Sequence, residues 1–298
     1  MKNALIVINP CAGVKRANKY MTDIITMLCS NGYRCTVQTT APNFNGHDAV
    51  MRFGKDSDLV VCIGGDGTYN EVVSGVIDCG LDCNIGYIPA GSTNDFGASL
   101  GLSKNILKAA ECVVSGRPQP FDVGSFNGRK FTYVASCGAF TSTSYSTPTD
   151  MKNALGHLAY LLEGMKSIPE IKPEHLKFKV NDREIEGDFI FAAICNSTSL
   201  GGVLKLDKKY VDMNDGLFEI LTVRSPKNIS ELAAAIHDLN FKNYESSNMI
   251  DLFSAEKVWI EASKSTDWSL DGERQEGIEN IVIENLHSAI KLIVPNKN

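Results

Sequence analysis

The feature that most constrains the fold is an alternation, over the first 122 residues, of short apolar runs rich in β-branched residues with segments of helical period. We expect strands at residues 4–9, 34–39, 59–63 and 84–88. We expect helices near residues 16–30, 47–53, 68–77 and 105–115. This alternation is typical of βαβ units, whose parallel strands are covered by helices on both faces. It predicts an α/β domain with a mostly parallel sheet over residues 1–122.

Beyond residue 122 the pattern changes to closely spaced strand candidates, separated by hairpin signals such as Asn127-Gly128. Helices are expected to interrupt this half at residues 151–165 and 230–239. We therefore expect a second domain, a β-rich antiparallel sandwich, over residues 123–287. Whether residues 288–298 return to the first domain stays open. The length of 298 residues suits two domains.

Composition and charge exclude several classes of protein. No apolar run approaches the ~18–20 residues needed to span a bilayer, and the N-terminus lacks the features of a signal peptide, so we expect a cytoplasmic protein. A net charge of −6 argues against a general nucleic-acid binder, which needs a clustered basic surface. The nine cysteines, odd in number and mostly in apolar stretches, are interpreted as free thiols.

Three of the predicted strands run into loops that are rich in glycine and small polar residues. These loops are residues 9–13, 64–71 and 89–96. The carboxyl ends of parallel strands meet at the edge of the sheet where ligands bind. We therefore expect the loops to build one site.

The second loop predicts a phosphate site. We expect Gly64, Gly65 and Gly67 to adopt positive φ, and the following helix to point its first N–H groups at an anion. The Asp66 carboxylate would repel a bare phosphate, which implies a bridging cation such as Mg²⁺. The loop is neither a Walker A motif nor G-x-G-x-x-G, since Asn70 takes the last glycine position. A plain tight turn is the alternative.

Four motifs, in order along the chain, resemble the diacylglycerol kinase catalytic family. They are NPCAG at 9–13, GGDGTYNE at 64–71, PAGSTNDF at 89–96 and LDGE at 270–273. The segments FDVG at 121–124, LGHLAYLLEG at 155–164 and NDGLFEI at 214–220 fit the same pattern. The resemblance is to soluble bacterial lipid kinases, which also look like sphingosine kinases. GGDGT alone is shared with NAD kinases.

The resemblance implies a fold like that of NAD kinases and diacylglycerol kinases. It also implies an ATP-dependent transfer of the γ-phosphoryl group to a lipid hydroxyl, with diacylglycerol as the first candidate. The cofactors would be ATP and Mg²⁺. The partner would be a lipid met at the membrane surface, without a transmembrane span or a nucleic acid, and a homodimer stays open. The lipid pocket is expected in the β-rich domain, although the motifs do not identify the acceptor.

The resemblance also assigns roles to residues. Glu273 would be the general base, and Asp66 would organise Mg²⁺ and the phosphate charge. The residues expected to bind the nucleotide are Asn9, Pro10, Cys11, Ala12, Gly13, Thr40, Gly64, Gly65, Asp66, Gly67, Thr68, Tyr69, Asn70 and Thr93. A structural Mg²⁺ would be held by Asp212, Asp215 and Leu217.

Several of these assignments have a plainer alternative. Glu273 stands in a polar turn, where a glutamate is usually just solvated, and Asn-Asp-Gly is an ordinary turn sequence. Lys15, Arg16 and Lys19 are candidates for neutralising phosphate charge, but a solvated first helical turn explains them equally well.

Two positions depart from the family pattern. Ala12 stands where serine is usual, and Ala98 stands where arginine is usual. The missing arginine would remove a partner for Asp95 or Asp66, which raises a rival function, a catalytically impaired nucleotide- or lipid-binding sensor. An NAD kinase is a further rival, although it would not be expected to carry PAGSTNDF or LDGE.

Overall fold

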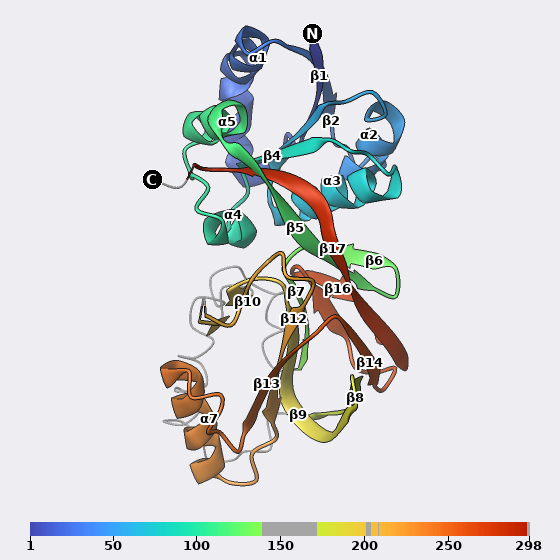
Figure 1. Cartoon of the computed structure of the whole chain (residues 1–298), viewed down its shortest axis with the longest axis vertical. Coiled ribbons are helices and arrows are strands. Elements are labelled where there is room, and N and C mark those ends of the chain that lie inside the picture. The colour runs from blue at the N-terminus through green and yellow to red at the C-terminus, as the bar shows by residue number, and fades with distance from the viewer. Residues whose placement is uncertain (139–171, 201–203, 208, 297–298) are drawn as a thin grey trace. The chain divides into compact units, whose positions relative to one another are not determined.

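The computed structural model describes residues 1–138, 172–200, 204–207 and 209–296 (Figure 1). The chain folds as two compact units. Unit 1 comprises Met1–Asp122 with Ser288–Asn298, and unit 2 comprises Val123–His287. The helix predicted over residues 151–165 lies outside the described residues.

The sheet of unit 1 has the strand order β17-β4-β3-β1-β2. These strands are β1 Lys2–Ile8, β2 Tyr33–Thr39, β3 Leu59–Gly64, β4 Asn84–Pro89 and the end of β17, Asn280–Val294. All their pairings are parallel, including that of Lys291 and Leu292 with β4. Every residue of β3 is buried, as expected for a strand covered on both faces. The predicted parallel sheet is confirmed.

Helices cover both faces of this sheet. They are α1 Met21–Ser30, α2 Gly46–Phe53, α3 Asp66–Asp78, α4 Asp95–Ser99 and α5 Ile106–Ser115. Leu28 of α1 and Val113 of α5 belong to one buried cluster with Ile6 and Val61 of the sheet. Figure 1 shows α2 and α3 together on the side away from α1 and α5.

Capping explains where α2 and α5 begin. Asn45 and Asp48 form a capping box at the start of α2, and the Asn105 side chain accepts from two backbone N–H groups of α5. The helix predicted over residues 16–30 is wrong in its first part. A 3-10 helix, η1, spans Ala12–Tyr20, and α1 begins only at Met21. No side chain caps η1, and Gly13 in its first turn has a φ of +48°, so an α-helix is not stabilised there.

Two strands carry the chain between the units. The chain leaves unit 1 through β5, Arg117–Phe126, and returns to it through β17. The returning segment is tied to unit 1 where Ser288 N donates to Asp122 Oδ1 at 2.7 Å.

Unit 2 is built mainly from antiparallel strands. Its strand order is β16-β15-β7-β9-β8-β14-β17, with β12 between β9 and β13 and with β6 beside β5. The strands not yet given are β6 Arg129–Phe131, β7 Val134–Gly138, β8 Glu174–Val180, β9 Arg183–Cys195, β10 Ser199–Leu200, β11 Leu204–Lys205, β12 Phe218–Arg224, β13 Ile250–Ala255, β14 Lys257–Glu261, β15 Trp268–Leu270 and β16 Glu273–Gln275. Helix α7, Ile229–Phe241, contains the segment predicted to be helical at 230–239.

Aromatic side chains dominate the core of unit 2. The largest are Phe126, Phe131, Phe178, Phe189, Phe218 and Trp268. The predicted hairpin at Asn127-Gly128 is confirmed. The two residues have φ of 47° and 91° and join β5 to β6, as the two positive φ values of a type I′ turn require. The predicted fold class, a mostly parallel α/β half and an antiparallel β-rich half, is confirmed.

Candidate active site

The three glycine-rich loops pack against one another at the carboxyl ends of β1, β3 and β4. Asn9 Nδ2 in the first loop donates to Thr68 Oγ1, which follows the second loop, at 3.1 Å. The backbone N–H of Ala90 in the third loop donates to Gly64 O at 2.7 Å. The expected convergence of the loops is confirmed.

The glycines allow this close packing, but the expectation of positive φ at Gly64, Gly65 and Gly67 is wrong. Gly65 is extended, with a φ of −88°, and none of the three has positive φ. Among the glycines of the loops, only Gly13 is left-handed, and a Cβ there would lie 2.0 Å from a backbone oxygen of the third loop. A Cβ on Gly91 would lie 2.6 Å from the Gly65 Cα. The loops therefore meet backbone to backbone.

Helix α3 begins directly at the second loop. Its N-cap is Gly65, and no side chain caps this end. Tyr69 N donates to Gly65 O at 3.0 Å, so the helical hydrogen bonds begin at this residue. The first N–H groups of a helix have no intrahelical acceptor, and together with the helix dipole they favour a bound anion. The second loop is therefore suited to a phosphate group.

Asp66 is held in place by hydrogen bonds. Its Oδ1 accepts from the Tyr87 hydroxyl at 3.3 Å, and its Oδ2 accepts from Asp95 N at 3.0 Å. Burial, and then the charge of Asp66, raise the pKa of Tyr87 well above its usual value, so Tyr87 stays a donor. A carboxylate fixed in this way at the start of α3 suits the binding of a divalent cation.

The third loop owes its shape to Asn94, to which sequence reasoning assigned no role. Asn94 has a φ of 53°, accepts from Gly91 N at 2.9 Å and donates to Gly91 O at 2.8 Å. This turn leads into α4 and presents Asp95 N to Asp66. Ala98 is exposed on α4, where its methyl group cannot supply the charge of an arginine.

Most of the residues predicted to bind the nucleotide lie partly or fully exposed around the packed loops. These are Asn9, Pro10, Cys11, Ala12, Gly13, Thr40, Gly65, Asp66, Gly67 and Thr93. Thr40 is held beside β1, since its N–H donates to Ile8 O at 2.9 Å. Of the basic residues after the first loop, Lys19 is exposed, and the side chains of Lys15 and Arg16 are outside the described part.

Tyr69 does not lie on this surface. Its side chain is completely buried, and its ring stacks on Tyr87 and Phe96 with centroid distances of 4.5 and 5.1 Å. The Tyr69 side chain therefore packs α3 against β4 and α4, and a contact of Tyr69 with the nucleotide stays a prediction. Asn70 is also buried and accepts from Ser74 Oγ at 3.2 Å.

Glu273 begins β16 and forms an ion pair that the sequence did not suggest. Arg129 Nη2 lies 2.9 Å from Glu273 Oε2, and Arg129 Nη1 donates to Arg274 O and to Gln275 Oε1, each at 3.1 Å. About half of the Glu273 side chain is exposed. The carboxylate is thus oriented by Arg129 and open to solvent.

Asp271, two residues earlier, has a structural role. It is buried with a φ of 52°, and its carboxylate accepts from Thr132 N at 2.5 Å, Thr132 Oγ1 at 2.8 Å, and the N–H groups of Tyr133 and Val134 at 3.0 Å. Burial raises the pKa of Asp271, against the opposing effect of these bonds. Asp271-Gly272 is a hairpin signal between β15 and β16, and this pattern could have been found in the sequence.

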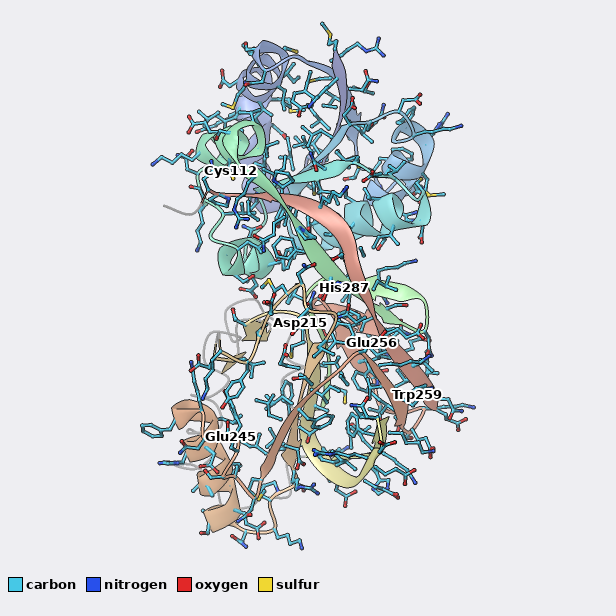
Figure 2. The ribbon with its side chains drawn as sticks, in the orientation of Figure 1. Cys112, Asp215, Glu245, Glu256, Trp259 and His287 are labelled. Carbon is cyan, nitrogen blue, oxygen red and sulfur yellow. The ribbon has the colours of Figure 1, made fainter. Side chains whose placement is uncertain are left out.

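The predicted metal residues lie in a turn before β12. Asp212 Oδ1 accepts from Asn214 N at 3.1 Å, and Asp215 Oδ1 accepts from Leu217 N at 2.9 Å. Figure 2 marks Asp215 and His287, and a Cβ on Gly216, the residue after Asp215, would lie 3.3 Å from His287 Nδ1. No group of three or more His, Cys, Asp or Glu side chains within the described residues could hold a metal ion.

Glu219, in β12 just beyond this turn, was missed by sequence reasoning. It is buried, and Ser254 Oγ donates to its Oε1 at 3.5 Å. Its Oε2 has no hydrogen-bond partner in the part of the chain that the structure describes. Burial, and then the charge of Asp215, raise the pKa of Glu219 to about 8. An incompletely satisfied buried carboxylate requires an explanation.

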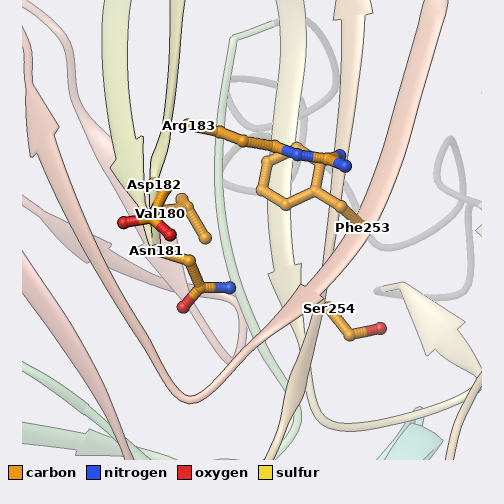
Figure 3. Close-up of a pocket in the computed structure, with 6 residues that line it drawn as sticks. All are labelled: Val180, Asn181, Asp182, Arg183, Phe253 and Ser254. Carbon is orange, nitrogen blue, oxygen red and sulfur yellow. The ribbon is translucent and has the colours of Figure 1, made fainter.

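A cavity of about 370 Å³ lies elsewhere in unit 2 (Figure 3). It is lined by Val180, Asn181, Asp182, Arg183, Phe253 and Ser254. It contains none of the predicted site residues. Its volume is near the low end of the roughly 300–1,000 Å³ of small-molecule sites. Most of the side chains that line it are polar or charged, which does not suit the binding of acyl chains.

Comparison with known proteins identifies the family. Residues 3–126 match the diacylglycerol kinase catalytic domain, and residues 137–294 match the YegS C-terminal NAD kinase beta sandwich-like domain. A diacylglycerol kinase of Bacillus subtilis is 30% identical over 299 residues, covering 100% of this chain and 98% of that protein. The chain belongs to the diacylglycerol kinase family. A diacylglycerol kinase of Staphylococcus saprophyticus is 26% identical over 298 residues, covering 99% and 96% of the two chains.

Two crystal structures from Bacillus anthracis share the fold of this diacylglycerol kinase family member. One, of a diacylglycerol kinase, has a TM-score of 0.74 at 22% identity, and the other has 0.78 at 24%. Both comparisons cover 98% of this chain and 97% of the other. No described helix is long and apolar enough to cross a bilayer. By its family, the protein is an enzyme of the lipid kinase class.

Proposed function

We propose that this protein catalyses ATP-dependent transfer of the γ-phosphoryl group to the hydroxyl of diacylglycerol. The observation that carries the proposal is the packing of three loops around Asp66 and the uncapped start of α3. Full-length relatives named diacylglycerol kinase support the choice of substrate. Phosphoryl transfer requires mainly positioning and charge neutralisation from the protein, and this loop cluster is suited to both.

In this proposal the nucleotide binds along the packed loops. The N–H groups at the start of α3 bind phosphate oxygens, and the bond from Asn9 to Thr68 keeps the first loop against the second. The exposed Thr93 of the third loop is a further proposed contact to the nucleotide. A Mg²⁺ ion carried with ATP would neutralise charge between the phosphates and Asp66.

Glu273 is the proposed general base. Its carboxylate takes the proton of the lipid hydroxyl while the hydroxyl oxygen forms a bond to the γ-phosphorus and the bond to ADP breaks. Arg129, 2.9 Å away, orients this carboxylate. Asp271 fixes the hairpin that presents it, through its hydrogen bonds to residues 132–134.

A structural Mg²⁺ at Asp212, Asp215 and Leu217 belongs to the proposal. The donors would be the Asp215 carboxylate and the backbone carbonyls of Asp212 and Leu217, and oxygen donors are the ligands that Mg²⁺ prefers. Leu217 O already accepts from Asn285 Nδ2 at 3.0 Å, which fixes its direction and leaves a second lone pair. The buried Oε2 of Glu219, two residues beyond Leu217, has no hydrogen-bond partner among the described residues. The residues present fit such an ion.

Diacylglycerol resides in a bilayer, so the protein meets its substrate at the membrane surface. We include in the proposal a peripheral contact of this kind on the cytoplasmic side. No nucleic acid takes part.

A second candidate function is a sensor that binds nucleotide or lipid without turnover, and Ala98 is the observation that favours it. A phosphate-transfer screen separates the two. ATP labelled at the γ-phosphate is offered with Mg²⁺ and vesicles containing diacylglycerol, phosphatidylglycerol or a sphingoid base, with NAD as a separate acceptor. Labelled phosphatidic acid is the expected product. ATP binding without transfer to any lipid would favour the sensor, and transfer to NAD alone would contradict both.

A further inference from the structure

Glu219 occupies a position in the sheet where a carboxylate is unusual. Its backbone pairs with Cys195 of β9 on one side and with Ser254 of β13 on the other. Its neighbours in the strand, Phe218 and Ile220, are buried in the aromatic core cluster of unit 2. Since successive side chains in a strand point to opposite faces, Glu219 points away from that core.

The Glu219 carboxylate is nevertheless buried and incompletely satisfied. Only 2% of the residue is exposed. The hydrogen bond from Ser254 Oγ to Oε1 is long at 3.5 Å, and among the described residues Oε2 has no partner. None of the described ion pairs supplies a cation to it. A buried carboxylate in this state is missing a partner.

Glu219 lies two residues beyond Leu217, directly after the turn that contains Asp212 and Asp215. Asn285 Nδ2 fixes Leu217 O in the same turn. No three carboxylates, imidazoles or thiols in the described part converge closely enough to bind one ion directly. Glu219 is therefore near this turn without being placed to ligate an ion together with both aspartates.

We propose that Glu219 is a positioning residue for Mg²⁺ in this turn, with its Oε2 accepting a hydrogen bond from water bound to the ion. Mg²⁺ in proteins usually keeps several of its waters. Groups that hold such waters are typically worth about 10–100-fold in metal affinity. This inference rests on the proposed site at Asp212, Asp215 and Leu217. It supplies the missing partner of Oε2 and a reason for the carboxylate in the sheet.

The test uses the full chain and Mg²⁺ alone. Affinity is measured by titration calorimetry, and melting temperature is measured in Mg²⁺ and in EDTA. E219Q keeps the shape of the side chain but replaces the carboxylate with an amide. We expect about 10–100-fold weaker Mg²⁺ binding and a smaller melting difference between Mg²⁺ and EDTA, with no loss of melting temperature in EDTA. E256Q makes the same charge change at an exposed position of unit 2 and should match the wild type (Figure 2).

Two results would overturn the inference. One is E219Q binding Mg²⁺ as tightly as the wild type, and the other is an equal fall of its melting temperature in Mg²⁺ and in EDTA. If E219Q does not fold, E219D replaces it: weaker binding with unchanged melting in EDTA supports the role of Glu219, and wild-type affinity refutes it. A wild type that binds no Mg²⁺ contradicts the proposed metal site itself. A wild type that binds Mg²⁺ beside an unaffected E219Q contradicts only the role of Glu219.

Discussion

Replacing Asp271 by asparagine should destabilise unit 2 far more than the small chemical change suggests. The Asp271 carboxylate is buried, and it accepts four hydrogen bonds from Thr132, Tyr133 and Val134. These bonds join the hairpin turn between β15 and β16 to the start of β7. Asparagine has the same shape, but only one of its two terminal atoms can accept.

The cost follows from the geometry of these bonds. If the asparagine oxygen accepts from Tyr133 and Val134, its amide nitrogen faces the N–H of Thr132, which then has no acceptor. A buried N–H left without a partner costs about 1–3 kcal/mol, and the bonds that survive lose the charge that made them roughly twice as strong. We therefore expect a loss of about 3 kcal/mol in the free energy of unfolding, a large part of the ~5–15 kcal/mol typical of proteins.

Glu273→Gln provides the comparison for Asp271→Asn. It removes one charge from the same hairpin, where Glu273 is half-exposed and held by a single ion pair. Such pairs are worth roughly 0.2–1 kcal/mol. Calorimetric melting of both variants beside the wild type measures the difference. Losses of similar size in the two variants would refute the idea that Asp271 fixes the turn.

Three further predictions concern the loops, the base and the metal turn. Gly13→Ala should weaken ATP binding by about tenfold or more, because residue 13 is left-handed and its Cβ would lie 2.0 Å from a backbone oxygen. Gly65→Ala should bind ATP nearly as the wild type does, because its Cβ would make only an ordinary contact at 3.4 Å. Nucleotide titration checks both. Arg129→Gln should lower kcat about tenfold or more without changing ATP affinity, and Arg129→Lys should recover part of the loss. An unchanged kcat in Arg129→Gln would contradict the idea that Arg129 orients Glu273. Asp215→Ala should abolish the difference in melting temperature between Mg²⁺ and EDTA, and a wild type without that difference would contradict the metal site.

Local patterns predicted the fold of unit 1 well. A strand such as Leu59–Gly64 is buried on both faces, so its apolar run is continuous and easily recognised. The loops that follow the strands converge because parallel strands end at one edge. The α-helix expected from residue 16 begins only at Met21, because the hydrophobic period does not distinguish an α-helix from the 3-10 helix that precedes it.

The sequence predicted that the three loops meet at one place, but it did not predict the local conformation and burial of their residues. The motif glycines were expected to adopt unusual φ, but at Gly91 the constraint is the approach of another backbone, which local sequence does not contain. Tyr69 is part of a motif, yet its burial follows from tertiary packing on Tyr87 and Phe96.

Contacts between distant residues explain the rest of what was missed. Arg129 reaches Glu273 across 144 positions, and Thr132 reaches Asp271 across 139. No spacing rule predicts such pairs from one sequence. Glu219 was overlooked for a similar reason, since a glutamate in an alternating strand is ordinarily assigned to the solvent face.

The most direct test of the central claim is the rate of phosphate transfer from ATP to diacylglycerol by the wild type and by Glu273→Gln. Glu276→Gln is the matched control, since Glu276 is an exposed glutamate three positions along, whereas Asp271 is buried and hydrogen-bonded. The account predicts transfer by the wild type and by Glu276→Gln. It predicts a kcat about 10²–10⁴-fold lower for Glu273→Gln, at unchanged ATP affinity. A wild type that binds ATP with Mg²⁺ but phosphorylates no lipid, or a Glu273→Gln variant that keeps the wild-type rate, would contradict it.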